Sequence, residues 1–137
     1  MLLTALDGRF GDSADAVAVD GVALSREQLL GAAGAVAARI AGAPALAVLA
    51  RPGIETVVAT LAGLLAGVPV VPVPPDAGPK EREHILRDSG APLLAVAARD
   101  RDTSAHGAQL LTVDPAERGA APDEPAADSG TAFVLYT

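Results

Sequence analysis

The chain has 137 residues, no cysteine and a formal net charge of −7. Its Lys and Arg residues form no cluster, which argues against nucleic acid or an anionic membrane as a partner, and the lack of cysteine excludes disulfides and thiolate zinc sites. Half of the residues are hydrophobic and only 2% are aromatic, so the core must consist of closely packed Ala, Val, Leu and Ile. With no signal peptide at the N-terminus, we expect a cytoplasmic protein.

The first elements expected are a hairpin and a helix. Apolar residues alternate on both sides of Asp20-Gly21 in residues 16–24, which predicts a β-hairpin with a two-residue turn. Ser25 and Gln28 have the spacing of a capping box, and the apolar positions that follow predict an amphipathic helix that ends before Gly42.

A strand, a helix and a second strand follow. Residues 45–50 form a strand-length apolar run, and the spacing after residue 54 predicts a helix that Gly67 ends. Residues 68–73 read as a strand in which Pro69 and Pro72 indicate an edge position or an irregular ladder. Although residues 56–75 carry no charge, these breaks favour a buried helix and strand over a membrane span.

The rest of the chain continues the alternation. A helix is expected from Pro79 to about Gly90, then strands at 92–98 and 109–113. A polar loop rich in Pro and Ala covers residues 114–130 and precedes a last strand, which we expect to be buried. This order predicts an α/β fold: a small N-terminal β-hairpin followed by a mostly parallel sheet with helices on both faces.

Few side chains suggest chemistry on their own. The candidates are His84, His106, Asp100, Asp102, Ser89 and the turn Arg51-Pro52-Gly53. The histidines lack partners at metal-ligand spacing, the aspartates alternate with arginines as in a charged surface loop, and the serine is explained by the end of a helix. The turn lies where a strand meets a helix, so it is either a plain turn or a ligand contact. Neither GxGxxG nor GxxxxGK occurs in the chain.

Four segments in order carry a family resemblance. They are ALSREQL (23–29), IETVVATLAGLLAGVPVVPVPP (54–75), HILRDSGAPLL (84–94) and FVLYT (133–137). Together they resemble the N-terminal part of the adenylate-forming (AMP-binding) superfamily, which includes acyl-CoA synthetases, luciferases and peptide synthetase adenylation domains. The Ala-rich first helix and the Pro-Val-Pro-Pro tract are most similar to the malonyl-CoA synthetase-like branch.

The resemblance implies an ATP-dependent acid-thiol ligase whose substrate is of the malonate or fatty acid type. ATP, Mg²⁺ and coenzyme A would serve the full-length enzyme. Residues 1–137 would be the N-terminal part of the AMP-binding domain, ending at the first residue of its phosphate loop. Thr137 is the only residue carried over as nucleotide-binding, with no catalytic or metal-binding residue. We therefore expect the chain to lack ligase activity and tight ligand binding without the C-terminal remainder.

Two alternatives remain open at this point. The chain could be a complete non-catalytic α/β binding domain, or half of a split enzyme that needs a second polypeptide. A small flavodoxin-like nucleotide binder is the other option, although no phosphate-binding loop follows the first strand of the expected sheet.

Overall fold

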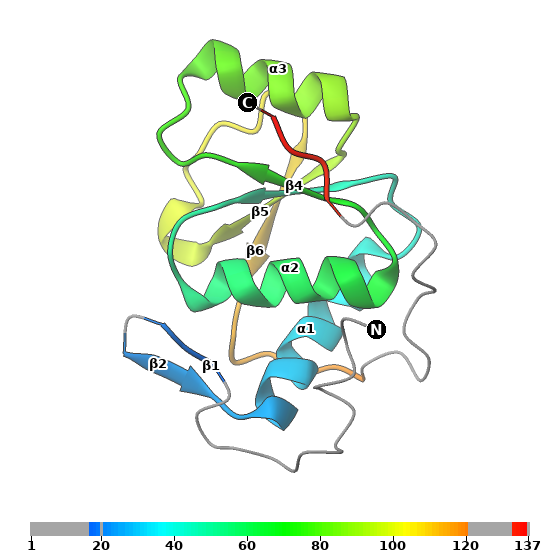
Figure 1. The fold of residues 1–137 in the computed structure, drawn as a ribbon, viewed down its shortest axis with the longest axis vertical. Coiled ribbons are helices and arrows are strands. Elements are labelled where there is room, and N and C mark those ends of the chain that lie inside the picture. Colours follow the sequence, from blue (N-terminus) through cyan, green and yellow to red (C-terminus); the bar gives the residue numbers. More distant parts are fainter. Residues whose placement is uncertain (1–16, 20, 121–132, 137) are drawn as a thin grey trace.

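The computed structural model describes residues 17–19, 21–120 and 133–136 (Figure 1). It opens with the expected antiparallel hairpin, formed by β1 (Val17–Val19) and β2 (Val22–Leu24). Val19 pairs with Val22, which leaves two residues between the strands. Gly21 has a φ of +80°, a left-handed conformation that favours glycine and explains its place in this turn.

Helix α1 (Arg26–Ile40) begins at the predicted capping box. The Ser25 Oγ accepts a hydrogen bond from the Gln28 backbone N–H at 3.1 Å, and the Gln28 Oε1 accepts one from the Ser25 N–H at 2.8 Å. Two N–H groups that a helix start would leave unpaired are thereby satisfied. The helix ends just before Gly42, whose φ is +81°.

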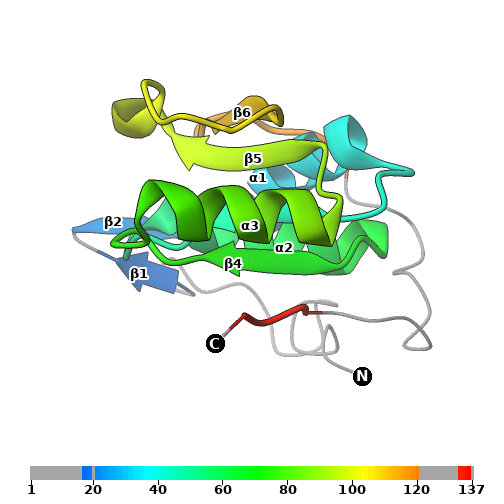
Figure 2. The ribbon, with the colours of Figure 1, turned by 90° about the horizontal axis from the view of Figure 1, so that it is seen from above.

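Within the described residues, four parallel strands form one sheet in the order β4-β3-β5-β6. They are β3 (Leu46–Leu49), β4 (Val70–Val73), β5 (Leu93–Ala97) and β6 (Gln109–Val113). Helix α2 (Ile54–Ala66) connects β3 to β4, and α3 (Pro79–Ser89) connects β4 to β5. The short 3₁₀ helix η2 (Ala98–Asp100) follows β5. Figure 2 shows these elements from above.

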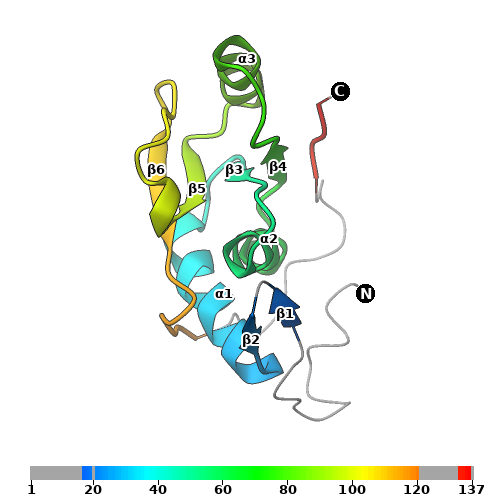
Figure 3. The same cartoon turned by 90° about the vertical axis from the view of Figure 1, so that its left-hand side faces the viewer.

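Helices cover both faces of the sheet, which confirms the predicted α/β fold. In β3, Leu46 and Val48 pack in one cluster with residues of α1 and α2, whereas Ala47 and Leu49 pack in another with residues of α3. Figure 3 shows α3 on one side of the sheet and α1 and α2 on the other. Because both faces are covered, all four β3 residues are buried and the strand reads as a continuous apolar run.

Pro69 and Pro72 fit the edge position that the sequence predicted for their strand, β4. Strand β4 ends the order of the four-stranded sheet, and Pro69 lies just before it. The carbonyls of Pro69 and Val73 accept hydrogen bonds from β3 and the residue after it, so odd-numbered residues point their backbone groups toward β3. Pro72 points the other way, and its missing N–H leaves the β3–β4 ladder intact.

Helix α2 packs closely on β4 at Gly63. A Cβ added to this glycine would lie 2.4 Å from Val70 Cγ2 and 3.1 Å from the Val68 carbonyl oxygen. Gly67 ends the helix in the left-handed conformation, as predicted. None of the helices in the described part of the chain has both the length and the apolar character that crossing a membrane requires.

The expectation of a buried last strand is wrong for residues 133–136. Phe133 forms an isolated parallel bridge with Val70, and the segment is otherwise without regular secondary structure. Phe133 is 43% exposed and Leu135 is 72% exposed, while Val134 and Tyr136 pack against the α3-side cluster. Apolar composition predicted an extended segment here, but only one of its faces is covered by described residues.

The first part of the predicted loop 114–130 is held against α1. Residues 114–120 contain no helix or strand, and the Gly119 N–H donates to the Gly31 carbonyl at 2.8 Å. A Cβ on Gly34 would lie 2.8 Å from the Gly119 carbonyl oxygen. Glycines at these positions let the two backbones approach closely. The remainder of the loop, 121–130, lies outside the described residues.

Candidate functional site

The loops that follow β3 and β5 meet at the carboxyl edge of the sheet, where α/β folds bind ligands. Arg51 follows β3, and its Nε lies 3.1 Å from the Asp100 Oδ2 in η2. Arg99 NH1 lies 3.6 Å from Glu55 Oε1 at the start of α2. The two ion pairs cross between the loops and join them.

Backbone contacts fix the turn at residues 51–53. The Arg51 N–H donates to the Leu49 carbonyl at 2.9 Å, and the Thr56 hydroxyl donates to the Arg51 carbonyl at 2.6 Å. Glu55 lies in the first turn of α2, where a negative charge interacts favourably with the helix dipole. The turn is thus accounted for by local bonding and by the start of the helix.

A shallow depression separates this turn from the hairpin. Its lining combines Val19 and Val22 of the hairpin with residues 51–55 and Arg99. Both arginines in it have a carboxylate partner, so a phosphate group would compete with Asp100 and Glu55 for them. The described part of this edge is therefore a charge-balanced contact and does not offer a prepared anion site.

The segment 133–136 runs beside β4, starting at the first residue of that strand. Its bridge with Val70 is parallel, and the Val134 N–H donates to the Val70 carbonyl at 2.9 Å. The segment therefore runs in the direction of β4, from the amino toward the carboxyl edge of the sheet. Thr137, the predicted nucleotide-binding residue, lies outside the described residues and stays a prediction.

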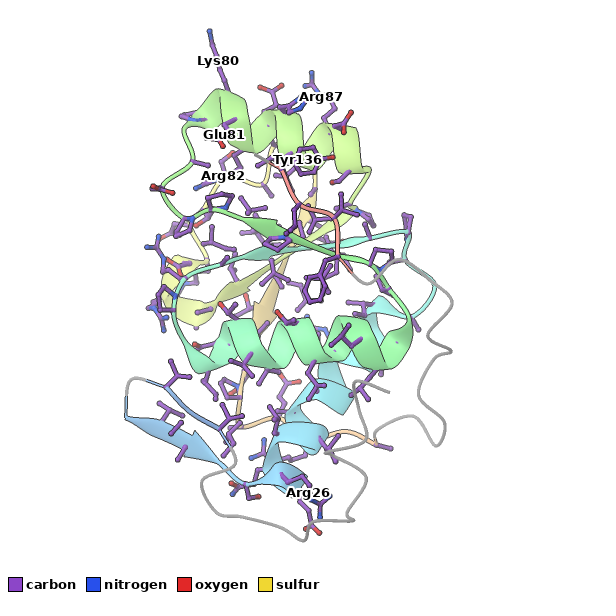
Figure 4. All side chains as sticks on the ribbon, viewed as in Figure 1. Arg26, Lys80, Glu81, Arg82, Arg87 and Tyr136 are labelled. Carbon is purple, nitrogen blue, oxygen red and sulfur yellow. The ribbon has the colours of Figure 1, made fainter. Side chains whose placement is uncertain are left out.

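Tyr136 joins this segment to α3. Its hydroxyl donates a hydrogen bond to Asp88 Oδ2 at 2.6 Å, and its ring meets the His84 ring edge-to-face with centroids 5.8 Å apart. The hydrogen bond to Asp88 raises the pKa of the Tyr136 phenol, because it favours the protonated form; burial and the charge of the carboxylate act in the same direction. Figure 4 shows Tyr136 against α3, whereas Lys80 extends away from the molecule.

Sequence reasoning missed this cluster. It found no partner for His84 at metal-ligand spacing and read Tyr136 as part of a buried strand. A usable signal was present, because His84 and Asp88 are four residues apart and so share one face of a helix. Nothing in the sequence, however, connects that face with a tyrosine 48 residues further along.

The other candidate residues lie at a helix end, in a turn or at the surface. The Ser89 hydroxyl lies at the end of α3, where it donates to the Leu86 carbonyl and accepts from the Ala91 N–H, both at 3.3 Å. His106 has a φ of +47° in the turn before β6. Asp102 is exposed. Among the described residues, no group of three His, Cys, Asp or Glu side chains is placed to hold a metal ion.

Comparison with known proteins identifies the family. The AMP-binding enzyme family model matches residues 8–137, nearly the whole chain. The chain belongs to this family of adenylate-forming enzymes. No curated protein matches it.

Solved structures of adenylate-forming enzymes match the same fold. A malonyl-CoA ligase in a ternary product complex with methylmalonyl-CoA and AMP has 41% identity and a TM-score of 0.76, covering 87% of this chain and 25% of its own. The O-succinylbenzoate coenzyme A synthetase MenE from Bacillus subtilis, with ATP and magnesium, has 24% identity and a TM-score of 0.70 over 86% of this chain and 27% of its own. Apo MatB from Rhodopseudomonas palustris has 22% identity and a TM-score of 0.68, covering 85% of this chain and 28% of its own.

The chain spans about a quarter of the length of these proteins. The resemblance read from the four sequence segments is confirmed, and so is the N-terminal adenylate-forming fold. The second and third matches support the fold alone at their level of identity.

Proposed function

We propose that the protein to which this chain belongs is an ATP-dependent acyl-CoA synthetase that acts on malonate or a closely related carboxylic acid. The observation that carries the proposal is the 41% identity to a malonyl-CoA ligase over 87% of this chain. The family match to AMP-binding enzymes supports adenylation as the first step.

In this reaction, a carboxylate oxygen attacks the α-phosphorus of ATP, and the bond to the leaving pyrophosphate breaks. The sulfur of coenzyme A then attacks the acyl carbon of the acyl-adenylate, AMP leaves, and the thiol proton is released. Mg²⁺ would offset the phosphate charge, held by residues beyond the described ones. A cytoplasmic location, small-molecule partners and the assignment of residues 1–137 to the AMP-binding domain are parts of the same proposal.

This chain would contribute scaffold and position. Its parallel sheet and flanking helices hold the segment 133–136 beside β4, and this segment runs parallel to β4. A threonine hydroxyl and backbone N–H groups at the end of a strand can donate hydrogen bonds to phosphate oxygens. We therefore assign Thr137 to phosphate contact and no described residue to the chemical steps.

The test is pyrophosphate release by the complete gene product with ATP, Mg²⁺ and one carboxylic acid at a time, followed by mass detection of the acyl-CoA. The panel is malonate, methylmalonate, acetate, octanoate and O-succinylbenzoate. We expect the highest kcat/KM with malonate or methylmalonate. Pyrophosphate release with none of the acids would refute adenylation, and a preference for octanoate would refute the substrate class.

A parallel assay of the 137-residue chain tests whether it is active alone. We expect no acyl-CoA from it, because it spans a quarter of the matched ligases. Measurable turnover by the chain alone would contradict this. Activity that returns only when a second polypeptide is added would instead support the split-enzyme alternative.

A further inference from the structure

Strand β4 can pair only incompletely with the segment 133–136. The Val70 carbonyl accepts from the Val134 N–H, which makes the first rung of a parallel ladder. Residue 72 is the next whose backbone groups face the segment, because alternate residues of a strand point to the same side. It is a proline, so the N–H that would donate to the segment is missing.

Side chains of α3 hold the segment beyond this gap. The Tyr136 hydroxyl is bonded to Asp88 at 2.6 Å, and its ring meets the His84 ring at an interplanar angle of 89°. Edge-to-face geometry at this separation is favourable for aromatic rings. His84 and Asp88 are exposed residues one helical turn apart, so both can reach the same ring.

Together, these contacts fix the direction in which the segment 133–136 runs. The tether at Tyr136 fixes the C-terminal end of the segment 133–136. The bridge at Phe133 fixes the other end against β4. A short segment held at both ends has a defined direction, which a single backbone hydrogen bond would not give it.

We propose that Asp88 and His84 are positioning residues: they hold Tyr136 in place of the ladder bond that Pro72 cannot make, and so set the direction of the segment 133–136 that leads to Thr137. The link to ATP rests on the function proposed above. The tether itself rests only on the contacts of Tyr136.

Hydrogen exchange of the complete gene product tests the tether without any activity assay. We expect Asp88→Ala and Tyr136→Phe each to raise the exchange rate of the peptide containing Val134 by about fivefold, since locally held segments exchange by local opening. His84→Ala should raise it less, and His84→Phe should restore it because the ring contact is kept. Arg87→Gln is the matched control, since it breaks an ion pair with Glu83 on the same helix. Unchanged exchange in Asp88→Ala would overturn the proposal.

Steady-state kinetics test the positioning role. We expect Asp88→Ala to raise KM for ATP by about fivefold while KM for the carboxylic acid stays within about twofold, as a displaced phosphate contact would. The double variant with Tyr136→Phe should lose no more than either single variant, because both remove one interaction. Faster exchange with unchanged KM for ATP would overturn the positioning role. Absence of ATP-dependent turnover in the unaltered protein would refute the proposed function, while the exchange result would still decide the tether.

Discussion

Gly63→Ala tests how tightly α2 packs on the sheet. The new methyl group would lie 2.4 Å from Val70 Cγ2, and Val70 is a buried, β-branched residue that cannot turn away. Alanine in a helix gains about 1 kcal/mol over glycine, whereas overpacking a core costs about 1–3 kcal/mol. Because the Val68 carbonyl at 3.1 Å blocks a second direction, we expect the larger cost and a net loss of about 1–2 kcal/mol.

A double-mutant cycle makes this reasoning refutable. Val70→Ala alone removes two buried methyl groups and should cost about 2–3 kcal/mol. In Gly63→Ala/Val70→Ala the new methyl occupies the vacated space, so the combined loss should be at least about 1 kcal/mol below the sum. Urea unfolding of the 137-residue chain followed by circular dichroism measures all four corners. A Gly63→Ala variant more stable than the parent, or strictly additive losses, would show that the close contact does not limit the packing.

Three further predictions concern other contacts. Ser25→Ala removes the capping box and should lower the free energy of unfolding by about 1 kcal/mol in the same urea assay; no change would mean that water replaces the cap. Gly34→Ala should destabilise the chain, because its Cβ would meet rigid backbone at 2.8 Å, whereas Gly31→Ala should not, because its Cβ meets a flexible arginine side chain; equal effects would contradict this. Tyr136 is the single tyrosine in a chain without tryptophan, and its phenol should titrate above the ordinary pKa of about 10. Asp88→Asn should lower the pKa of Tyr136. Because the folded-state pKa is raised, the stability from this bond is present below about pH 10 and is lost as the pH rises through the folded-state pKa.

Local signals in the sequence predicted most of the elements. The capping box at Ser25 fixed the start of α1, and glycines at positions 67 and 90 marked the ends of α2 and α3, because only a residue without Cβ adopts the left-handed cap readily. The alternation of strands and helices predicted a parallel sheet, because each helix must return the chain to the edge of the sheet at which the previous strand began. These are properties of a few neighbouring residues, so one sequence can reveal them.

Contacts between distant segments were not predictable in this way. The order β4-β3-β5-β6, the approach of Gly119 to Gly31 and the bond from Tyr136 to Asp88 each join residues far apart in the chain. Hydrophobicity indicated that residues 133–136 would pack against something, but not that only alternate side chains would be covered. Likewise, the sequence showed that Arg51 carries a charge, but not that Asp100 in η2 is its partner.

Val70 connects the interior of the domain with the segment that leads to Thr137. Its side chain lies beside Gly63 in α2, while its carbonyl accepts the hydrogen bond from Val134. A shift of β4 that accommodates a larger residue at position 63 would therefore also move the acceptor that holds the segment. Asp88 holds the same segment from α3, through its hydrogen bond with the Tyr136 hydroxyl. The position of the segment thus depends on two supports, one from the packed core and one from an exposed helix face.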